Sequence, residues 1–160
     1  MESRKVFIDT LVQLAKKDDK VCLIVCDVGF SLIEEFKKKF PNRYFNFGVT
    51  EQSAVLIATA LALAGFKPYV YSMINFVVFR TYEMVRNGIG MHKANVKLIG
   101  VSGAEKYKFY GFSHNMIHKN EDVEVLKHLP IKIYVPTSEK EVREAIIKSY
   151  KEKKSTYIRL

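Results

Sequence analysis

The sequence lacks the features of a secreted or membrane protein. None of its apolar runs within 160 residues is long enough to span a membrane. Its N-terminus, "MESRKVFIDTLVQLAKK", places charges among the apolar residues, which is unlike a secretory signal. Repeats and low-complexity linkers are also missing. We therefore expect a cytoplasmic protein that contacts no membrane and folds as a single domain over residues 1–160.

Cysteine is scarce, and its placement argues against metal binding. Cys22 and Cys26 are the only cysteines, and both lie in the apolar run "VCLIVCDVG". Buried free thiols are the ordinary outcome of such a pattern. A C-x-x-x-C pair with no further cysteine and no nearby histidine is a poor metal site. The sequence thus predicts no metal ligands in this chain.

Positive charge is in excess, with 26 basic residues against 17 acidic ones and a formal net charge of +9. One interpretation is a solvated lysine surface. The other is attraction to anions, which include phosphorylated metabolites, nucleic acid and an acidic partner subunit. The basic residues are scattered and no nucleic-acid-binding motif accompanies them, so we do not expect nucleic-acid binding.

Strand-like apolar runs alternate with helical patterns along the whole chain. We expect strands at residues 21–27, 43–47, 67–73, 96–103, 131–136 and 155–160, and helices at 6–17, 31–40, 51–65, 76–93, 121–129 and 138–154. Ser31 and Thr50 are candidate caps, and helix 51–65 is apolar nearly all round, which predicts burial. The alternation predicts an α/β fold in three layers (α/β/α) with a mainly parallel sheet.

Ligands of such sheets lie at the carboxyl ends of the strands, where Asp27, Ser72, Gly103 and Glu51 follow expected strands. Glu51, in the first turn of helix 51–65, attracts most interest. A buried carboxylate there suits proton exchange with a bound heterocycle. The alternative is a solvent-facing acid that only complements the helix dipole.

Other candidates also have ordinary explanations. Met73, Phe76 and Phe79 follow the third expected strand at helical spacing, which usually marks core residues. His114 lies in the Gly/Ser-containing loop of "GFSHNMIHK", where most histidines are surface residues. Their functional interpretation depends on the sequence around them.

Taken together, "RYFNFGVTEQSAV…ALALAGFKPYVYSMINFVVFRTYEMVRN" and "GFSHNMIHKNEDVEVLKHLPIKIYVPTSEKEV" resemble the pyrimidine-binding domain of transketolase-like thiamine diphosphate enzymes. The family pattern has G-I-x-E-[HQ], A-x-G-x-A-x-x-G-x-x-P, an aromatic F-x-x-F segment, and D-G-x-T-H-Q followed by E-D and I-P. The resemblance runs from about Arg4 to Arg159. It implies the thiamine diphosphate-binding fold of a pyrimidine domain.

The resemblance implies cofactor-binding roles for five residues. Glu51 would bond the ring nitrogen of the aminopyrimidine and favour the imino tautomer, whose nitrogen removes the thiazolium proton. Phe76 would stack on the pyrimidine, and Met73 and Phe79 would line the same pocket. Asp27 matches an acid at the end of the first strand, close to the cofactor.

The resemblance also implies a substrate channel. Arg4, Ser31 and Arg159 match residues that hold a sugar phosphate, and His114 matches a catalytic channel histidine. Ordinary surface charge is the alternative for Arg4 and Arg159. Two departures leave the sugar specificity open. Tyr110 replaces the aspartate that contacts a substrate hydroxyl, and Ser102 replaces another channel histidine.

The chain has no G-D-G motif, which in this family belongs to the diphosphate-binding domain. The resemblance therefore implies a separate diphosphate-binding subunit that holds Mg²⁺ and the diphosphate in an α2β2 assembly. We expect a native short subunit of a split transketolase that lacks the third domain. A fragment of a longer protein is the alternative.

The expected reaction is transfer of a two-carbon ketol unit between sugar phosphates or related carbohydrates. A deoxyxylulose-phosphate-synthase-like subunit, a 2-oxo acid dehydrogenase beta-like subunit and a non-catalytic interaction subunit are the alternatives. The sequence does not specify the donor, the acceptor, the pathway or the partner.

Overall fold

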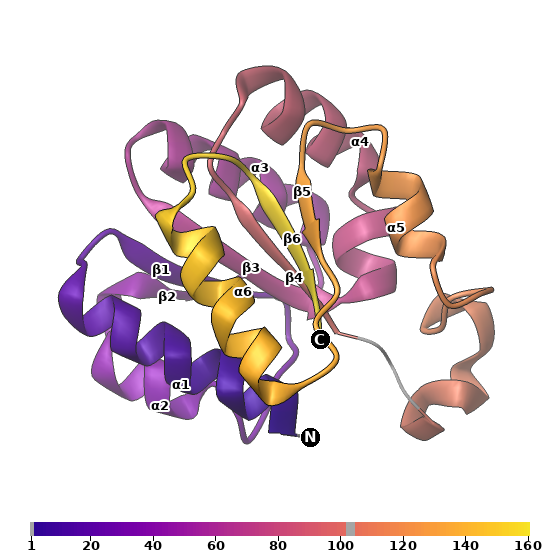
Figure 1. The fold of residues 1–160 in the computed structure, drawn as a ribbon, viewed down its shortest axis with the longest axis horizontal. Helices are drawn as coiled ribbons and strands as arrows, with labels where there is room; N and C mark the ends of the chain where they lie inside the picture. The colour runs from indigo at the N-terminus through magenta and orange to yellow at the C-terminus, as the bar shows by residue number, and fades with distance from the viewer. Residues whose placement is uncertain (1, 102–104) are drawn as a thin grey trace.

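The computed structural model describes residues 2–101 and 105–160, which form one six-stranded sheet flanked by helices (Figure 1). The strands are β1 (Val21–Val25), β2 (Tyr44–Asn46), β3 (Lys67–Met73), β4 (Lys97–Val101), β5 (Lys132–Tyr134) and β6 (Thr156–Arg159). The α-helices are α1 (Glu2–Lys17), α2 (Glu34–Lys39), α3 (Glu51–Leu63), α4 (Tyr82–Met84), α5 (Glu121–Leu126) and α6 (Glu139–Lys151). The order is β2-β1-β3-β4-β6-β5 and every pairing is parallel, which confirms the predicted fold class.

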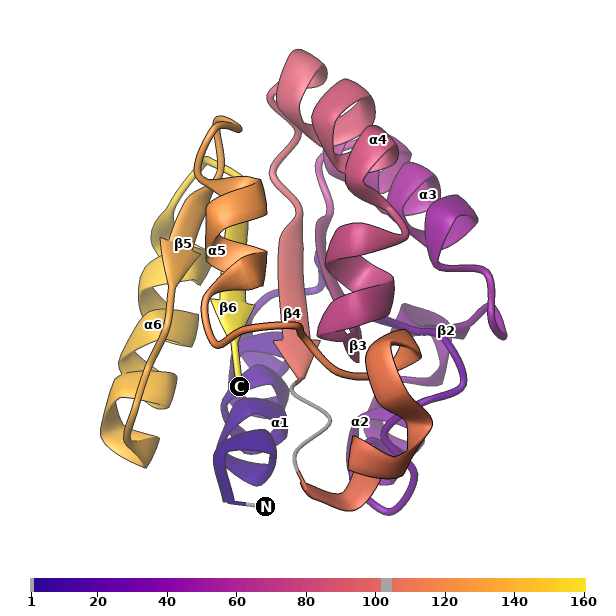
Figure 2. The same ribbon diagram turned by 90° about the vertical axis from the view of Figure 1, so that its right-hand side faces the viewer.

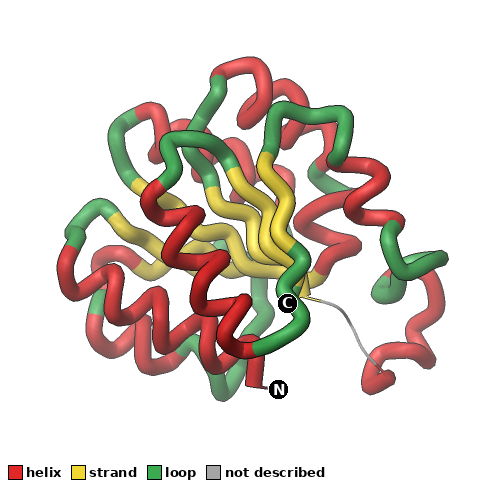
Figure 3. Tube along the Cα trace, in the orientation of Figure 1, coloured by secondary structure: helices red, strands yellow, loops and turns green. Residues whose placement is uncertain are grey.

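The sheet has a hydrophobic core on each face. Helices α1, α2 and α6 cover one face, while α3, the helical stretch around α4, and α5 cover the other (Figures 1 and 2). Strands β1 and β4 are buried along their full length, as expected for central parallel strands that have helices on both sides. Figure 3 shows how the strands alternate with helices along the chain.

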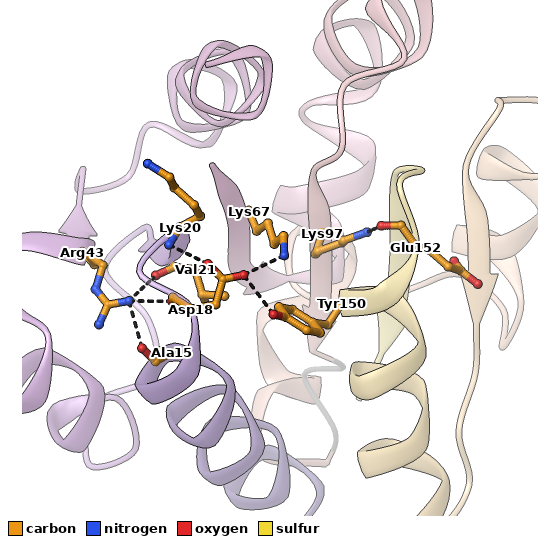
Figure 4. Close-up of polar contacts among 9 residues, drawn as sticks. All are labelled: Ala15, Asp18, Lys20, Val21, Arg43, Lys67, Lys97, Tyr150 and Glu152. Atoms are coloured by element: carbon orange, nitrogen blue, oxygen red, sulfur yellow. Dashed lines mark hydrogen bonds and ion pairs between the residues drawn. The ribbon is translucent and has the colours of Figure 1, made fainter. Parts of the chain in front are cut away.

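Buried and half-buried polar side chains join elements near the amino ends of the strands (Figure 4). Asp18, just after α1, pairs with Lys67 at 2.6 Å and accepts a hydrogen bond from Tyr150 of α6 at 2.9 Å. Lys97, the first residue of β4, is fully buried and donates to the carbonyl oxygen of Lys154 at 2.7 Å. These contacts connect the elements at the amino ends of the strands. A ligand would bind at the opposite, carboxyl ends.

Both predicted helix caps differ from the structure. Ser31 does not begin a helix, because α2 starts at Glu34 and Ser31 has a left-handed φ of 63°. Its backbone N–H donates to Glu34 Oε1 at 2.7 Å. Thr50 does occupy the cap position of α3, but its hydroxyl donates to the Phe47 carbonyl at 2.8 Å and forms no cap bond.

Helix α3 is not buried all round, contrary to the prediction. Its inner face carries Ala54, Val55 and Ala58 into the core, whereas Leu56 and Leu63 are 48% and 59% exposed. Helix α3 therefore carries apolar side chains on two faces, and only one of these faces packs against the sheet. Within residues 2–101 and 105–160, no helix combines the length and apolarity needed to cross a membrane.

The predicted helix at 76–93 is helical but irregular. Two π-helical segments, Asn75–Phe79 and Val85–Gly90, flank the single turn of α4. Single-turn π segments occur often at functional sites, because the extra residue re-aims the side chains of the turn. The first segment lies directly after β3, where the sheet meets the cleft described below.

Candidate functional site

A cleft of about 550 Å³ opens at the carboxyl ends of β1, β3 and β4. The chain leaves β1 toward β2 and leaves the neighbouring β3 in the opposite direction, toward β4. Ligands of parallel sheets bind at such a switch point. The residues that line the cleft are Arg4, Cys26, Asp27, Val28, Gly29, Phe30, Val49, Glu51, Tyr71, Ser72, Met73, Phe76, Arg80, Val101, Tyr107, Tyr110 and His114.

Glu51 is the buried acid of this cleft. It is the first residue of α3, follows the left-handed turn at Gly48, and is only 1% exposed. Its Oε1 accepts a long hydrogen bond from the Ser72 hydroxyl at 3.5 Å, and its Oε2 pairs with Arg80 Nη1 at 2.6 Å. The solvent-facing alternative for Glu51 is therefore wrong, because the carboxylate lies inside the fold at the end of β3.

Phe76 provides an aromatic surface beside that carboxylate. It lies in the first π-helical segment and is half-buried. The guanidinium carbon of Arg80 lies 4.1 Å from its ring centre, and the His114 ring meets it edge-on at 5.0 Å. The Arg80 guanidinium thus contacts both the Glu51 carboxylate and the Phe76 ring.

Aromatic residues form the wall near His114. The ring of Tyr110 stacks on that of His114 at 4.4 Å between centres, and Tyr107 stacks at 6.3 Å. The Ser113 hydroxyl lies 2.8 Å from His114 Nδ1. The segment that carries Tyr107 and Tyr110, Glu105–Ser113, lies beyond the carboxyl end of β4 (Figure 2). His114 therefore lines the cleft within an aromatic stack, rather than as an isolated surface residue.

Polar groups on the opposite wall come from α1 and from the loop after β1. Arg4 lies close to the hydroxyl of Tyr71. Burial raises the pKa of that hydroxyl, and the charge of Arg4 partly offsets the rise. Asp27 has a left-handed φ of 52° and accepts a hydrogen bond from Asn46 Nδ2 at 2.9 Å. Asn46 returns the interaction by accepting from the Asp27 backbone N–H at 3.1 Å. The pair holds the Asp27 carboxylate at the mouth of the cleft.

Cys26 lines the cleft but has little nucleophilic character. Burial, with the negative charge of Glu51 nearby, raises the pKa of this thiol to about 12. Burial has the same effect on the pKa of Cys22. Both cysteines are free and buried, as predicted.

Three predicted site residues do not line the cleft. Ser31 directly follows Phe30 in the sequence, and Phe30 lines the cleft whereas Ser31 does not. Phe79 packs against the hydrophobic core next to α3. Arg159 donates to Asp122 Oδ1 at 2.9 Å and to the Lys119 carbonyl at 2.7 Å. Its guanidinium is therefore already engaged by a fully buried carboxylate. The predicted positions Ser102 and Gly103 lie outside the described residues.

One known protein family matches the chain over its whole length. The family described as "Transketolase, pyrimidine binding domain" matches residues 1–160. The chain belongs to this family.

Relatives of the chain include a component of a multi-subunit transketolase and a larger enzyme. An apulose-4-phosphate transketolase subunit of Phocaeicola vulgatus is 33% identical over 145 residues, which make up 89% of the chain and 46% of that protein. The 1-deoxy-D-xylulose-5-phosphate synthase of Bacillus velezensis is 34% identical over 140 residues, 86% of the chain and 21% of the synthase.

Among solved structures, one described as "Split gene transketolase, inactive beta4 tetramer" superposes with a TM-score of 0.84. It is 29% identical and aligns with 99% of the chain and 50% of its own length. The chain thus spans about half the length of this structure and of the apulose-4-phosphate transketolase relative.

The donor set of the cleft fits the pyrimidine end of thiamine diphosphate. The buried Glu51 carboxylate can accept a hydrogen bond from a ring nitrogen, and the half-buried Phe76 ring offers a stacking surface. For the metal end, the described residues contain no group of three or more His, Cys, Asp or Glu side chains that could hold an ion. The site within this transketolase pyrimidine-binding domain therefore fits the pyrimidine end of the cofactor.

Arg80, the partner of Glu51, was not among the residues predicted from the sequence. It follows Phe76 by four residues, a spacing that places two side chains on one face of a helix. That spacing is the signal that could have revealed the contact with Phe76. The ion pair with Glu51 joins residues 29 positions apart, so only the fold reveals it. Tyr71 and Tyr107 were missed for the same reason.

Proposed function

We propose that residues 1–160 form a single pyrimidine-binding domain that serves as one subunit of a thiamine diphosphate- and magnesium-dependent transketolase-like transferase. The observation that carries the proposal is the buried Glu51 carboxylate, which opens into the cleft beside the face of Phe76. A carboxylate with almost no solvent contact needs bonded partners. Ser72 and Arg80 are its partners in the structure, and a heterocycle with a protonated ring nitrogen has matching chemistry.

Thiamine diphosphate, when bound, supplies a nucleophilic carbon and an electron sink for reactions of carbonyl compounds. In this proposal Glu51 would accept a hydrogen bond from the protonated ring nitrogen of the pyrimidine and hold that proton in place. Phe76 orients the ring by stacking, with Met73 beside it, and Asp27 lies near the mouth of the cleft. The low solvent access at Glu51 keeps water from competing for that proton.

Arg4 and His114 are the proposed substrate contacts, with His114 as a catalytic residue. The guanidinium of Arg4 suits a phosphate or carboxylate group, because its planar fork matches two oxygens. The His114 ring has the chemistry to exchange a proton with a sugar hydroxyl. Ser31 and Arg159 are not carried into the proposal, since neither lines the cleft.

The reaction we propose is transfer of a two-carbon ketol unit between sugar phosphates or related carbohydrates. Support comes from relatives whose names identify them as transketolases or their subunits. Condensation of the deoxyxylulose-phosphate synthase type is the second candidate, favoured by the 34% identity to the Bacillus velezensis synthase. Products formed by the assembled enzyme from ketose phosphates and from 2-oxo acids would separate the two.

A separate subunit would hold Mg²⁺ and the diphosphate, and an α2β2 heterotetramer is the proposed assembly in the cytoplasm. Two-fold assemblies are common among soluble oligomers, and the outer apolar face of α3 offers surface for contacts. The gene next to that of this chain is the first place to look for the partner, which should carry a G-D-G motif.

Replacement of Glu51 tests the catalytic role. Glu51→Gln in the assembled enzyme should lower turnover about 1,000-fold, because the amide cannot take up the proton. Glu83→Gln, which removes an exposed acid from α4, is the matched control and should retain activity. Sedimentation should show the same assembly for both variants. A Glu51→Gln enzyme with unchanged turnover would rule out this role.

A further inference from the structure

Arg80 occupies the two contacts that the proposed function assigns to the pyrimidine. Its Nη1 lies 2.6 Å from Glu51 Oε2, and its guanidinium carbon lies 4.1 Å from the Phe76 ring centre. Its backbone is fixed: the N–H donates to the Asn75 carbonyl at 3.1 Å, and the carbonyl accepts from Gln52 Nε2 at 3.2 Å. The side chain therefore reaches back over the ring from a firmly held position.

A guanidinium and an aminopyrimidine share their recognition chemistry. Both are planar and delocalised, both can donate N–H to a carboxylate, and both stack on an aromatic face. A pyrimidine that bonds Glu51 Oε2 and stacks on the same face of Phe76 would compete with the Arg80 guanidinium for both contacts. Binding in that position requires the guanidinium to move.

The burial of the two partners decides which one moves. The Arg80 side chain is 39% exposed, so an outward rotation keeps it hydrated. Glu51 is 1% exposed and fixed in the first turn of α3. Without a cation or a ligand, its carboxylate would be buried and unpaired, which is strongly destabilising. Arg80 thus provides the cation that pairs with this buried acid.

We infer that Arg80 is an internal latch that holds Glu51 and covers Phe76 in the cofactor-free subunit, and that the pyrimidine displaces it. The inference rests on the proposed function, because it takes thiamine diphosphate as the displacing ligand. Arg80 acts here as a positioning residue, which holds the Glu51 carboxylate in place until the cofactor arrives.

The binding test uses the assembled enzyme and titration calorimetry with thiamine diphosphate in the presence of Mg²⁺. Arg80→Gln should bind the cofactor about tenfold more tightly than the wild type, because the competing ion pair and ring contact are gone. Arg86→Gln is the matched control. This variant removes a cation from the same helical stretch. In the wild type, Arg86 Nη1 donates to Asn87 Oδ1 at 2.8 Å. The control should leave the affinity unchanged.

An Arg80→Gln affinity that is equal to or weaker than that of the wild type would overturn the latch and leave the proposed function intact. A weaker affinity would indicate that Arg80 contacts the cofactor directly. Absence of cofactor binding to the wild type and to both variants would overturn the proposed function and the latch together. The two failures are therefore distinguishable.

Thermal melting of the full chain without a partner gives a second test that needs no ligand. Arg80→Gln should lower the melting temperature by about 3 °C in the wild-type background, because Glu51 loses its cation. In a Glu51→Gln background the same change should have a clearly smaller effect. Equal shifts in the two backgrounds would show that the pair is not coupled, and would overturn the latch.

Discussion

Lys97 provides a test of the core that depends on a single buried amine. It begins β4, is fully buried, and donates to the carbonyl oxygen of Lys154 at 2.7 Å. It also lies 3.3 Å from the carbonyl oxygen of Glu152, to which it donates a second hydrogen bond (Figure 4). Burial lowers the pKa of its ammonium group from 10.5 to about 8. The native protein therefore releases this proton at a lower pH than the unfolded chain does.

The sign of the effect on stability follows from proton binding. Between pH 8 and pH 10.5 the unfolded chain binds more protons at Lys97 than the native protein, so stability rises with pH. Below pH 8 the native state carries the full cost of the buried charge. The two pKa values correspond to roughly 3 kcal/mol of free energy of unfolding, most of it regained by pH 10.

The informative variant is Lys97→Met, which keeps the chain length and removes the titrating group. The free energy of unfolding of the wild type relative to Lys97→Met should rise by roughly 2 to 3 kcal/mol between pH 7 and pH 10. The change with pH carries the prediction, because two carbonyl groups also lose their donor in the variant at every pH.

Urea unfolding followed by circular dichroism, at constant ionic strength and at several pH values, measures this difference. Lys140→Met, at an exposed position in the first turn of α6, is the matched control, and its difference from the wild type should stay nearly constant. A difference between the wild type and Lys97→Met that does not change from pH 7 to pH 10 would show that burial does not lower the pKa of this amine.

Two further predictions concern buried groups near the cleft and β6. Burial raises the pKa of Cys26 to about 12. Its reaction with an aromatic disulfide reagent at pH 8, followed by absorbance, should therefore be about 1,000-fold slower in the native protein than in urea. Equal reaction rates in the two states would contradict this. Asp122→Asn should lower the free energy of unfolding by about 3 kcal/mol, because Arg159 and the Tyr157 hydroxyl lose a buried carboxylate. Glu124→Gln, at an exposed position of α5, is its control in urea unfolding and should change stability by less than about 0.5 kcal/mol.

Local sequence patterns predict the architecture well. The six apolar runs and the helical patterns between them specify a parallel sheet, because parallel strands need helical crossovers and become buried on both faces. The same topology brings Asp27, Glu51 and Ser72 to one edge before any relative is considered. The boundaries of the segments are predicted less well. Helix α2 begins at Glu34 and not at Ser31, because the surrounding loop gives Ser31 a left-handed backbone conformation.

Contacts between distant segments are harder to predict from sequence. Arg159 looks like a free arginine in "YIRL", yet in the fold it pairs with the buried Asp122, 37 positions away. Helix α3 looks fully buried in the sequence, because periodicity cannot tell a face that meets the sheet from one that meets solvent. Side-chain pairing across elements depends on register and packing, which no single segment encodes.

The proposed function requires this chain to supply the pyrimidine half of a composite thiamine diphosphate site. Calorimetric titration of thiamine diphosphate and Mg²⁺ into the chain alone, and into its complex with the G-D-G-bearing partner, measures this requirement. We expect tight binding to the complex and no comparable binding to the chain alone. Absence of binding to a complex shown by sedimentation to have formed would mean that the cleft does not serve this cofactor.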